Sequence, residues 1–166
     1  MDSTTSIWII KSLLILALLY LALIDWRTFR LPNAITFPLI FLGLAFNAAS
    51  DLRLTTPSSA CVGAFMGYAS IWSLNAGYRL LKNSNGIGMG DAKLLAALGA
   101  WLGWSTLPSI LLIASTTGVI GGFIWLQWRG HQLKQAFPFG PFLVIAGIIE
   151  LLWPQLIPTL ILPKLI

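Results

Sequence analysis

Two aspartates at the borders of apolar segments are the residues of this sequence best suited to chemistry. Asp25 closes the apolar run 13–24, and Asp91 follows the glycine-rich turn 86–90. The chain has only five acidic residues. Ionisable groups at membrane depth are costly, so a pair of them indicates a functional site. Two carboxyl groups that share a proton can activate a water molecule and protonate a leaving group, which is how aspartic proteases hydrolyse amides.

The composition places these acids in a membrane protein. Apolar residues make up 57% of the 166 residues and charged residues 9%, whereas soluble domains carry about 25% charged residues. The single cysteine excludes a disulfide framework and a multi-cysteine zinc site. The net charge of +5 comes from basic residues that stand singly beside apolar segments, as topology determinants do. We therefore expect an integral membrane protein without a nucleic-acid partner.

The apolar segments predict an all-α fold of about six transmembrane helices within one domain, residues 1–166. A spanning helix needs roughly 20 mainly apolar residues. The candidate segments are 7–24, 34–49, 58–81, 94–128 and 139–157. The fourth segment is too long for one span, because about 35 residues would reach about 52 Å. We expect it to break near 103–108 into a short helix and a second one.

Proline and glycine refine this plan. Pro32 stands just before the second segment, where its missing N–H suits the start of a helix. Gly63 and Gly67 form a small-xxx-small spacing in the third segment, which lets another helix backbone approach closely. With no side chain at Gly88 and Gly90, the backbone before Asp91 can come close to a peptide substrate or adopt a positive φ.

Charge asymmetry orients the predicted helices. With the N-terminus outside, seven basic residues fall on the inner side and three on the outer side, as the positive-inside rule requires. The inner residues are Arg27, Arg30, Arg79, Lys82, Lys93, Arg129 and Lys134, and the outer ones are Lys11, Arg53 and Lys164. This topology places Asp25 and Asp91 on the same, cytoplasmic side. We expect the inner charges to attract anionic membrane lipids.

Each acid also has a purely structural interpretation. Asp91 can be the N-cap of a helix 92–104, because aspartate is among the best capping residues. Asp25 can be an interfacial acid that pairs with Arg27 or Arg30, although an acid at a helix C-terminus has the wrong charge for capping. The sequence pattern leaves these interpretations open beside the catalytic one.

Four blocks of sequence resemble the type IV prepilin peptidases. Residues 88–104, GMGDAKLLAALGAWLGW, closely resemble that family's GxGD segment, and residues 25–33, DWRTFRLPN, look like its first-aspartate motif. The blocks 42–47, LGLAFN, and 138–141, PFGP, also match in the right order. The resemblance extends from about residue 16 to residue 147.

The resemblance implies an aspartic endopeptidase of the bacterial inner membrane with six helices and its active site facing the cytoplasm. Its substrates would be prepilins or pseudopilins, whose basic leader it would remove, typically after a glycine. Asp25 and Asp91 carry over as the two catalytic acids. The residues that would support them or shape the substrate loop are Gly88, Gly90, Pro32 and Asn33. Lys93 matches a lysine of the family, but we expect it to be a solvated or headgroup-facing loop charge.

The resemblance also has limits. Long members of the family carry an N-terminal segment with paired CxxC motifs, which is associated with N-methylation of the new pilin terminus. This chain begins just before the first acid-bearing segment and has one cysteine, which does not support methyltransferase activity. No requirement for zinc or S-adenosylmethionine follows, and we expect no cofactor and no metal.

Two other functions stay open. One is a proton-coupled carrier or channel subunit, in which the acids relay protons; polar residues deep in several helices would favour it. The other is a non-catalytic assembly factor of a pilus or secretion system that has kept the fold. The sequence pattern does not determine the oligomeric state.

Overall fold

The computed structural model describes residues 3–82, 88–129 and 138–154. These residues form six α-helices and one short 3₁₀ helix. The elements are α1 (Ser3–Thr28), α2 (Asn33–Ala49), α3 (Pro57–Lys82), α4 (Met89–Leu102), η1 (Trp104–Thr106), α5 (Leu107–Arg129) and α6 (Gly140–Leu152). The predicted all-α fold of six helices is confirmed. The predicted end of the last segment, at residue 157, lies outside the described residues, as do Lys134 and Lys164.

The predicted break in the long uncharged segment is also confirmed, and it has a conformational cause. Gly103 ends α4 with φ 90° and ψ 168°, a region of backbone space that is essentially restricted to glycine. The short helix η1 then redirects the chain. Pro108 lies in the first turn of α5, where the missing N–H removes no helical hydrogen bond.

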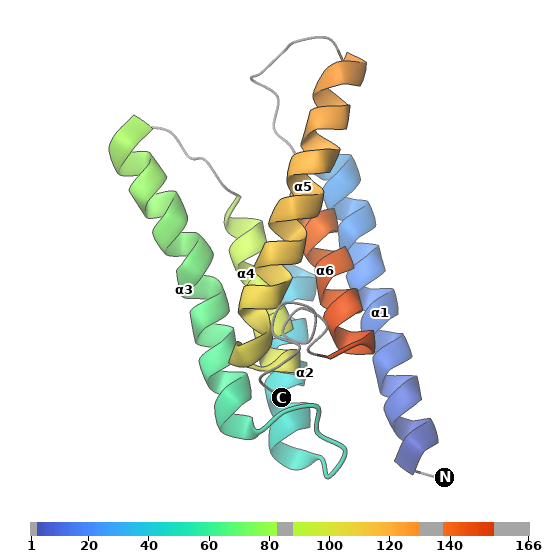
Figure 1. Ribbon diagram of the computed structural model, residues 1–166. Coiled ribbons are helices and arrows are strands. Elements are labelled where there is room, and N and C mark those ends of the chain that lie inside the picture. Colours follow the sequence, from blue (N-terminus) through green and yellow to red (C-terminus); the bar gives the residue numbers. More distant parts are fainter. Residues whose placement is uncertain (1–2, 83–87, 130–137, 155–166) are drawn as a thin grey trace, which may run out of the picture.

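Successive α-helices alternate in direction (Figure 1). One end of the bundle therefore collects the C-termini of α1, α3 and α5 and the N-termini of α2, α4 and α6. We call it the acid end, because Asp25 lies in the last turns of α1 and Asp91 in the first turn of α4. The central element is α4, which packs against α3, α2 and α6.

Glycines allow α3 to approach α4 backbone to backbone. A Cβ atom on Gly63 would collide with the carbonyl oxygen of Gly99, and a Cβ atom on Gly99 would collide with that of Gly63. A Cβ atom on Gly67 would lie 2.6 Å from the carbonyl oxygen of Leu95. The close approach predicted from the small-xxx-small spacing is thus confirmed, and the partner helix is α4.

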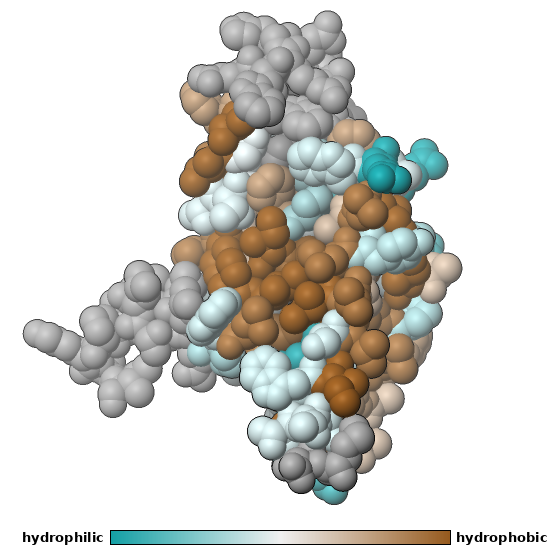
Figure 2. Space-filling model, turned by 90° about the vertical axis from the view of Figure 1, so that its right-hand side faces the viewer, coloured by the Kyte–Doolittle hydropathy of each residue, from teal (hydrophilic) through white to brown (hydrophobic). Residues whose placement is uncertain are grey.

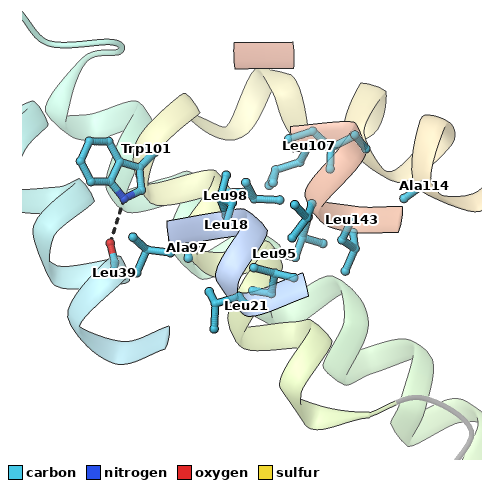
Figure 3. Close-up of a cluster of buried hydrophobic side chains, with 14 of the residues drawn as sticks. Leu18, Leu21, Leu39, Leu95, Ala97, Leu98, Trp101, Leu107, Ala114 and Leu143 are labelled. Carbon is cyan, nitrogen blue, oxygen red and sulfur yellow. Dashed lines mark hydrogen bonds between the residues drawn. The ribbon is translucent and has the colours of Figure 1, made fainter. Parts of the chain in front are cut away.

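Buried leucines of α1, α4 and α6 pack together in the core of the bundle (Figure 3). Leu18 and Leu21 of α1, Leu95 and Leu98 of α4 and Leu143 of α6 are at most 1% exposed. Because lipid tails are as apolar as leucine, such contacts stabilise the bundle by close van der Waals packing. This contact holds α1 and α6 against α4 in the core of the bundle.

The outer surface is apolar, as expected of a chain surrounded by lipid. Leu16 on α1, Phe65 on α3 and Val119 on α5 are 63%, 72% and 73% exposed, and Figure 2 shows a broad apolar area across the middle of one face. Two helices, Thr4–Thr28 and Trp104–Ile124, are long and apolar enough to cross a membrane. Exposed apolar area of this extent would aggregate in water and is stable against lipid tails. The protein is an all-helical, polytopic membrane protein.

Candidate active site

Asp25 is buried between α1 and α6. Asp25 is 5% exposed. The backbone N–H of Gly140, at the start of α6, donates a hydrogen bond to Asp25 Oδ2 at 3.2 Å. Arg27 and Arg30 are both exposed, and neither forms a recorded ion pair with Asp25 in the part of the chain that the structure describes. The interpretation of Asp25 as an interfacial acid paired with an arginine is therefore wrong.

Asp91 lies inside α4 rather than at its cap. The helix begins at Met89 with Gly88 as its N-cap, so the interpretation of Asp91 as the N-cap of a helix 92–104 is wrong. The residue is 8% exposed. Its place in the first turn brings it to the positive end of the helix dipole. Asp25 and Asp91 are close enough for the charge of one carboxyl group to affect the other.

The turn after α1 packs directly against the start of α4. A Cβ atom on Gly90 would lie 3.1 Å from the Cβ atom of Leu31. Lys93 Nζ donates a hydrogen bond to Asn33 Oδ1 at 2.6 Å and lies 5.4 Å from the ring centre of Phe37. The first-aspartate block and the GxGD block therefore meet in space. The expectation that Lys93 lies in a loop is wrong, because Lys93 lies in α4 and binds α2; its hydrogen bond to Asn33 is exposed, as a solvated or headgroup-facing charge requires.

The chain reverses tightly between the first acid and α2. Phe29 has φ 52°, which is rare for a bulky residue, and its N–H donates to the Asp25 carbonyl oxygen at 2.8 Å. Pro32 is the N-cap of α2, and its carbonyl oxygen accepts the N–H groups of Ile35 and Thr36 at 3.1 Å. The prediction that Pro32 begins this helix is confirmed. This turn carries Asn33 to the Lys93 side chain.

Of the two glycines of the GxGD block, Gly90 has a steric role, and neither has a positive φ. The positive φ that the sequence allowed is absent at Gly88, whose φ is −67°, and Gly103 is the glycine with positive φ among the described residues. A Cβ atom on Gly88 would lie 3.5 Å from Asp91 Oδ2, an ordinary contact, whereas one on Gly90 would press against Leu31. Gly90 therefore permits the contact between the two blocks. The expected approach of a peptide substrate to these glycines stays a prediction.

A third buried acid, Glu150, lies near the other end of α6. It is 2% exposed. The next residue, Leu151, accepts a hydrogen bond from Lys11 Nζ at 3.1 Å through its carbonyl oxygen. Ten residues of helix rise by about 15 Å, so Glu150 is well separated from Gly140 and from the pair of acids. Within the described residues, no group of three or more histidine, cysteine, aspartate or glutamate side chains is arranged to hold a metal ion.

Reasoning from the sequence assigned no role to Gly140 beyond its place in the block 138–141. The available signal was a proline-flanked glycine before an apolar run, which marks a helix start with free N–H donors. The identity of the acceptor could not be read from that pattern, because it depends on how α1 packs against α6.

These features define a class of protein: a polytopic helical membrane protein with two buried acids, carried by different helices, at one end of the bundle. A family model described as the type IV leader peptidase family matches residues 12–123. The chain belongs to this family.

Relatives named prepilin leader peptidase/N-methyltransferase support the same assignment. The protein of Aeromonas salmonicida (strain A449) is 45% identical over 141 residues, which cover 85% of this chain and 48% of the relative. The protein of Dickeya chrysanthemi is 44% identical over 131 residues, 79% of this chain and 46% of the relative. That of Pseudomonas putida is 43% identical over 137 residues, 82% of this chain and 47% of the relative. The chain spans about half the length of these curated relatives. No solved structure matches it.

Proposed function

We propose that this chain is a membrane aspartic endopeptidase that removes the basic leader from type IV prepilins or pseudopilins. The observation that carries the proposal is the burial of Asp25 on α1 and Asp91 on α4 at the same end of the bundle. Membership of the type IV leader peptidase family and the names of the relatives support this class of substrate. The name of the relatives also includes N-methyltransferase, an activity that we do not propose for this chain.

The two acids would share the proton that hydrolysis requires. In a buried site two like charges repel strongly, so one carboxyl group stays protonated while the other is ionised. The ionised group removes a proton from water as the water oxygen attacks the carbonyl carbon of the scissile peptide bond. The protonated group then supplies the proton that the leaving amine needs when the C–N bond breaks. One water is consumed, and the products are a carboxyl group and an amine.

We propose that the acid end faces the cytoplasm across the bacterial inner membrane. The positive-inside rule supports this orientation, because Arg27, Arg30 and Arg79 lie toward the helix ends that meet there. These charges would attract anionic lipid headgroups rather than the basic leader of a prepilin. The leader would then be cut where it leaves the apolar pilin helix, next to the start of α4.

Cleavage of a synthetic prepilin-like peptide by the purified protein in liposomes tests the proposal. The peptide carries a basic leader that ends in glycine, followed by an apolar helix, and mass spectrometry identifies the products. We expect the wild type to cleave after the glycine and Asp25→Asn to leave the peptide intact. Asp51→Asn is the matched control, because Asp51 is exposed between α2 and α3, and it should cleave like the wild type.

The other outcomes separate the alternatives. A wild type that folds in liposomes but leaves the peptide intact would contradict the peptidase proposal and favour a non-catalytic assembly factor. Proton uptake into the same liposomes that depends on Asp25 would favour a proton-coupled carrier. With S-adenosylmethionine present, the mass of the product also shows whether its new N-terminus is methylated.

A further inference from the structure

Gly140 contacts Asp25 at the acid end but has no role in the proposed reaction so far. The first N–H groups of a helix have no partner within the helix itself. In α6, Phe142 and Leu143 donate theirs to the Phe139 carbonyl oxygen at 3.1 and 3.2 Å, and the residue after Gly140 is a proline without an N–H. The N–H of Gly140 is the remaining donor of this turn, and it is directed at Asp25 Oδ2.

The position of Gly140 leaves no space for a side chain. A Cβ atom there would lie 2.5 Å from Oδ2 and 2.9 Å from Cγ of Asp25. The backbone conformation is not the reason for glycine, since Gly140 is the first residue of α6 and positive φ occurs among the described glycines at Gly103 alone. Glycine is required so that the backbone of α6 can reach the acid.

Aromatic residues on both sides of Gly140 hold the start of α6 against α5. A Cβ atom on Gly121 would lie 2.5 Å from Cζ of Phe142, and one on Gly118 would lie 3.3 Å from Cε2 of Phe139. The two aromatic rings therefore pack against glycines of α5. This contact fixes where the Gly140 N–H lies relative to the bundle.

We propose that Gly140 is a positioning residue for the peptidase reaction: its backbone N–H holds Oδ2 of Asp25, so that Oδ1 is oriented toward the attacking water. The inference rests on the proposed function, because it assumes that the Asp25 carboxyl group reacts. A Cβ atom at residue 140 must move by about 0.9 Å relative to Oδ2 to reach ordinary contact at 3.4 Å. A misplacement of about 1 Å in a catalytic group can cost about 100-fold in rate.

Kinetics of Gly140→Ala in liposomes test the inference. We expect kcat to fall about 100-fold because the carboxyl group is displaced, while KM stays within about twofold of the wild-type value because substrate contacts are unchanged. Gly147→Ala is the matched control: it lies in the same helix, and its Cβ atom would lie 2.5 Å from Leu98 Cδ2. That variant should melt at a lower temperature but keep the wild-type kcat per folded molecule.

Difference infrared spectroscopy supplies a readout that does not depend on cleavage. The carboxyl band that Asp25→Asn removes identifies Asp25, and Asp91→Asn identifies Asp91 in the same way. In Gly140→Ala the Asp25 band should shift and the Asp91 band should keep its position. If Gly140→Ala does not fold, Gly121→Ala replaces it, because displacing Phe142 moves the start of α6; the same band should shift and kcat should fall by a smaller factor.

Two results would overturn the inference. One is an Asp25 band and a kcat that both equal the wild-type values in Gly140→Ala, or in Gly121→Ala where that variant is used. The other is an equal loss of kcat in Gly140→Ala and Gly147→Ala, which would indicate a general packing role. Normal cleavage by Asp25→Asn would instead contradict the proposed function, so the two failures are distinguishable.

Discussion

The two ends of the helix bundle differ in the polar groups that they bury: one end buries a fully hydrogen-bonded amide, and the other buries two acids. Where α2 leads into α3, Asn47 is 0% exposed, and its side-chain amide makes five hydrogen bonds of 2.9 to 3.1 Å to backbone groups. The partners are Gly43, Ala100, Trp101, Leu54 and Thr55. We call this set the Asn47 clasp. At the acid end, two carboxyl groups that would repel each other if both were ionised are buried in the same part of the bundle.

This difference separates stability from function. The Asn47 clasp ties the C-terminal part of α4 to α2 and to the loop before α3, and a buried amide with its hydrogen bonds satisfied stabilises a unique packing. The acid end keeps two buried ionisable groups that would repel each other if both were ionised, an arrangement that a stability optimum would remove. Such unfavourable arrangements persist where the chemistry needs them. The following predictions test whether the two roles are in fact separate.

The largest effect should come from Asp91→Asn. We expect cleavage to fall by about 10²–10⁴-fold, the range for loss of a general acid or base, while the melting temperature stays the same or rises because a buried ionisable group is replaced by a neutral one. Cleavage of the prepilin-like peptide and thermal unfolding in detergent measure the two quantities on one preparation. Asp51→Asn serves as the control. Loss of cleavage together with a clearly lower melting temperature would contradict the separation of roles.

Asn47→Ala should have the opposite profile. It leaves several buried backbone groups without their partner, so we expect a loss of about 3 kcal/mol in the free energy of unfolding. Cleavage per folded molecule should stay at the wild-type level, since the clasp lies at the end of α4 away from Asp91. Denaturant titration and the cleavage assay check both parts. An active-site defect in molecules that remain fully folded would show that the two ends are coupled.

Gly63→Ala extends the comparison to the middle of α4. The added methyl group would force α3 away from Gly99, and overpacking of this kind costs about 1–3 kcal/mol. Gly77→Ala in the same helix is the matched control, because no heavy atom lies within 4 Å of its Cβ position; it should be neutral or slightly stabilising. Thermal unfolding of both variants is the measurement. Equal effects of the two substitutions would contradict the close contact between α3 and α4.

The smallest effect concerns the link between the two motif blocks. Lys93→Met and Asn33→Ala each remove the hydrogen bond between Lys93 Nζ and Asn33 Oδ1. We expect each substitution to lower kcat/KM by an amount that corresponds to about 1 kcal/mol of transition-state stabilisation. The double variant should lose no more than either single variant. The free energy of unfolding should change less, because the bond between the two side chains is exposed. Fully additive losses in a double-mutant cycle would show that this bond does not position the blocks.

Much of the fold could be predicted from the sequence because it depends on local properties. Apolar length and the charges between segments gave six helices. The break at 103–108 was predictable because the uncharged segment 94–128 is too long for one span, and because a glycine favours a helix end and a proline a helix start. The close approach at Gly63 was likewise visible as spacing, although its partner α4 was not.

The contacts of the candidate site were harder to predict because they join residues far apart in the chain. The bond from Lys93 to Asn33 and the bond from Gly140 to Asp25 depend on how α2, α4 and α6 pack together. The start of α4 was placed too late, since aspartate is a strong N-cap and glycine is compatible with both loop and helix. The structure instead uses Gly88 as the cap, which leaves Asp91 inside the helix.

The central claim is that Asp25 and Asp91 act as one pair, and the cleavage rate of the double variant tests it most directly. Asp25→Asn, Asp91→Asn and the double variant are compared on the prepilin-like peptide at matched folded concentration. Residues that act as a unit give strongly non-additive losses, so we predict that the double variant is no slower than either single variant. Wild-type cleavage by either single variant, or a double loss equal to the product of the two single losses, would contradict the claim.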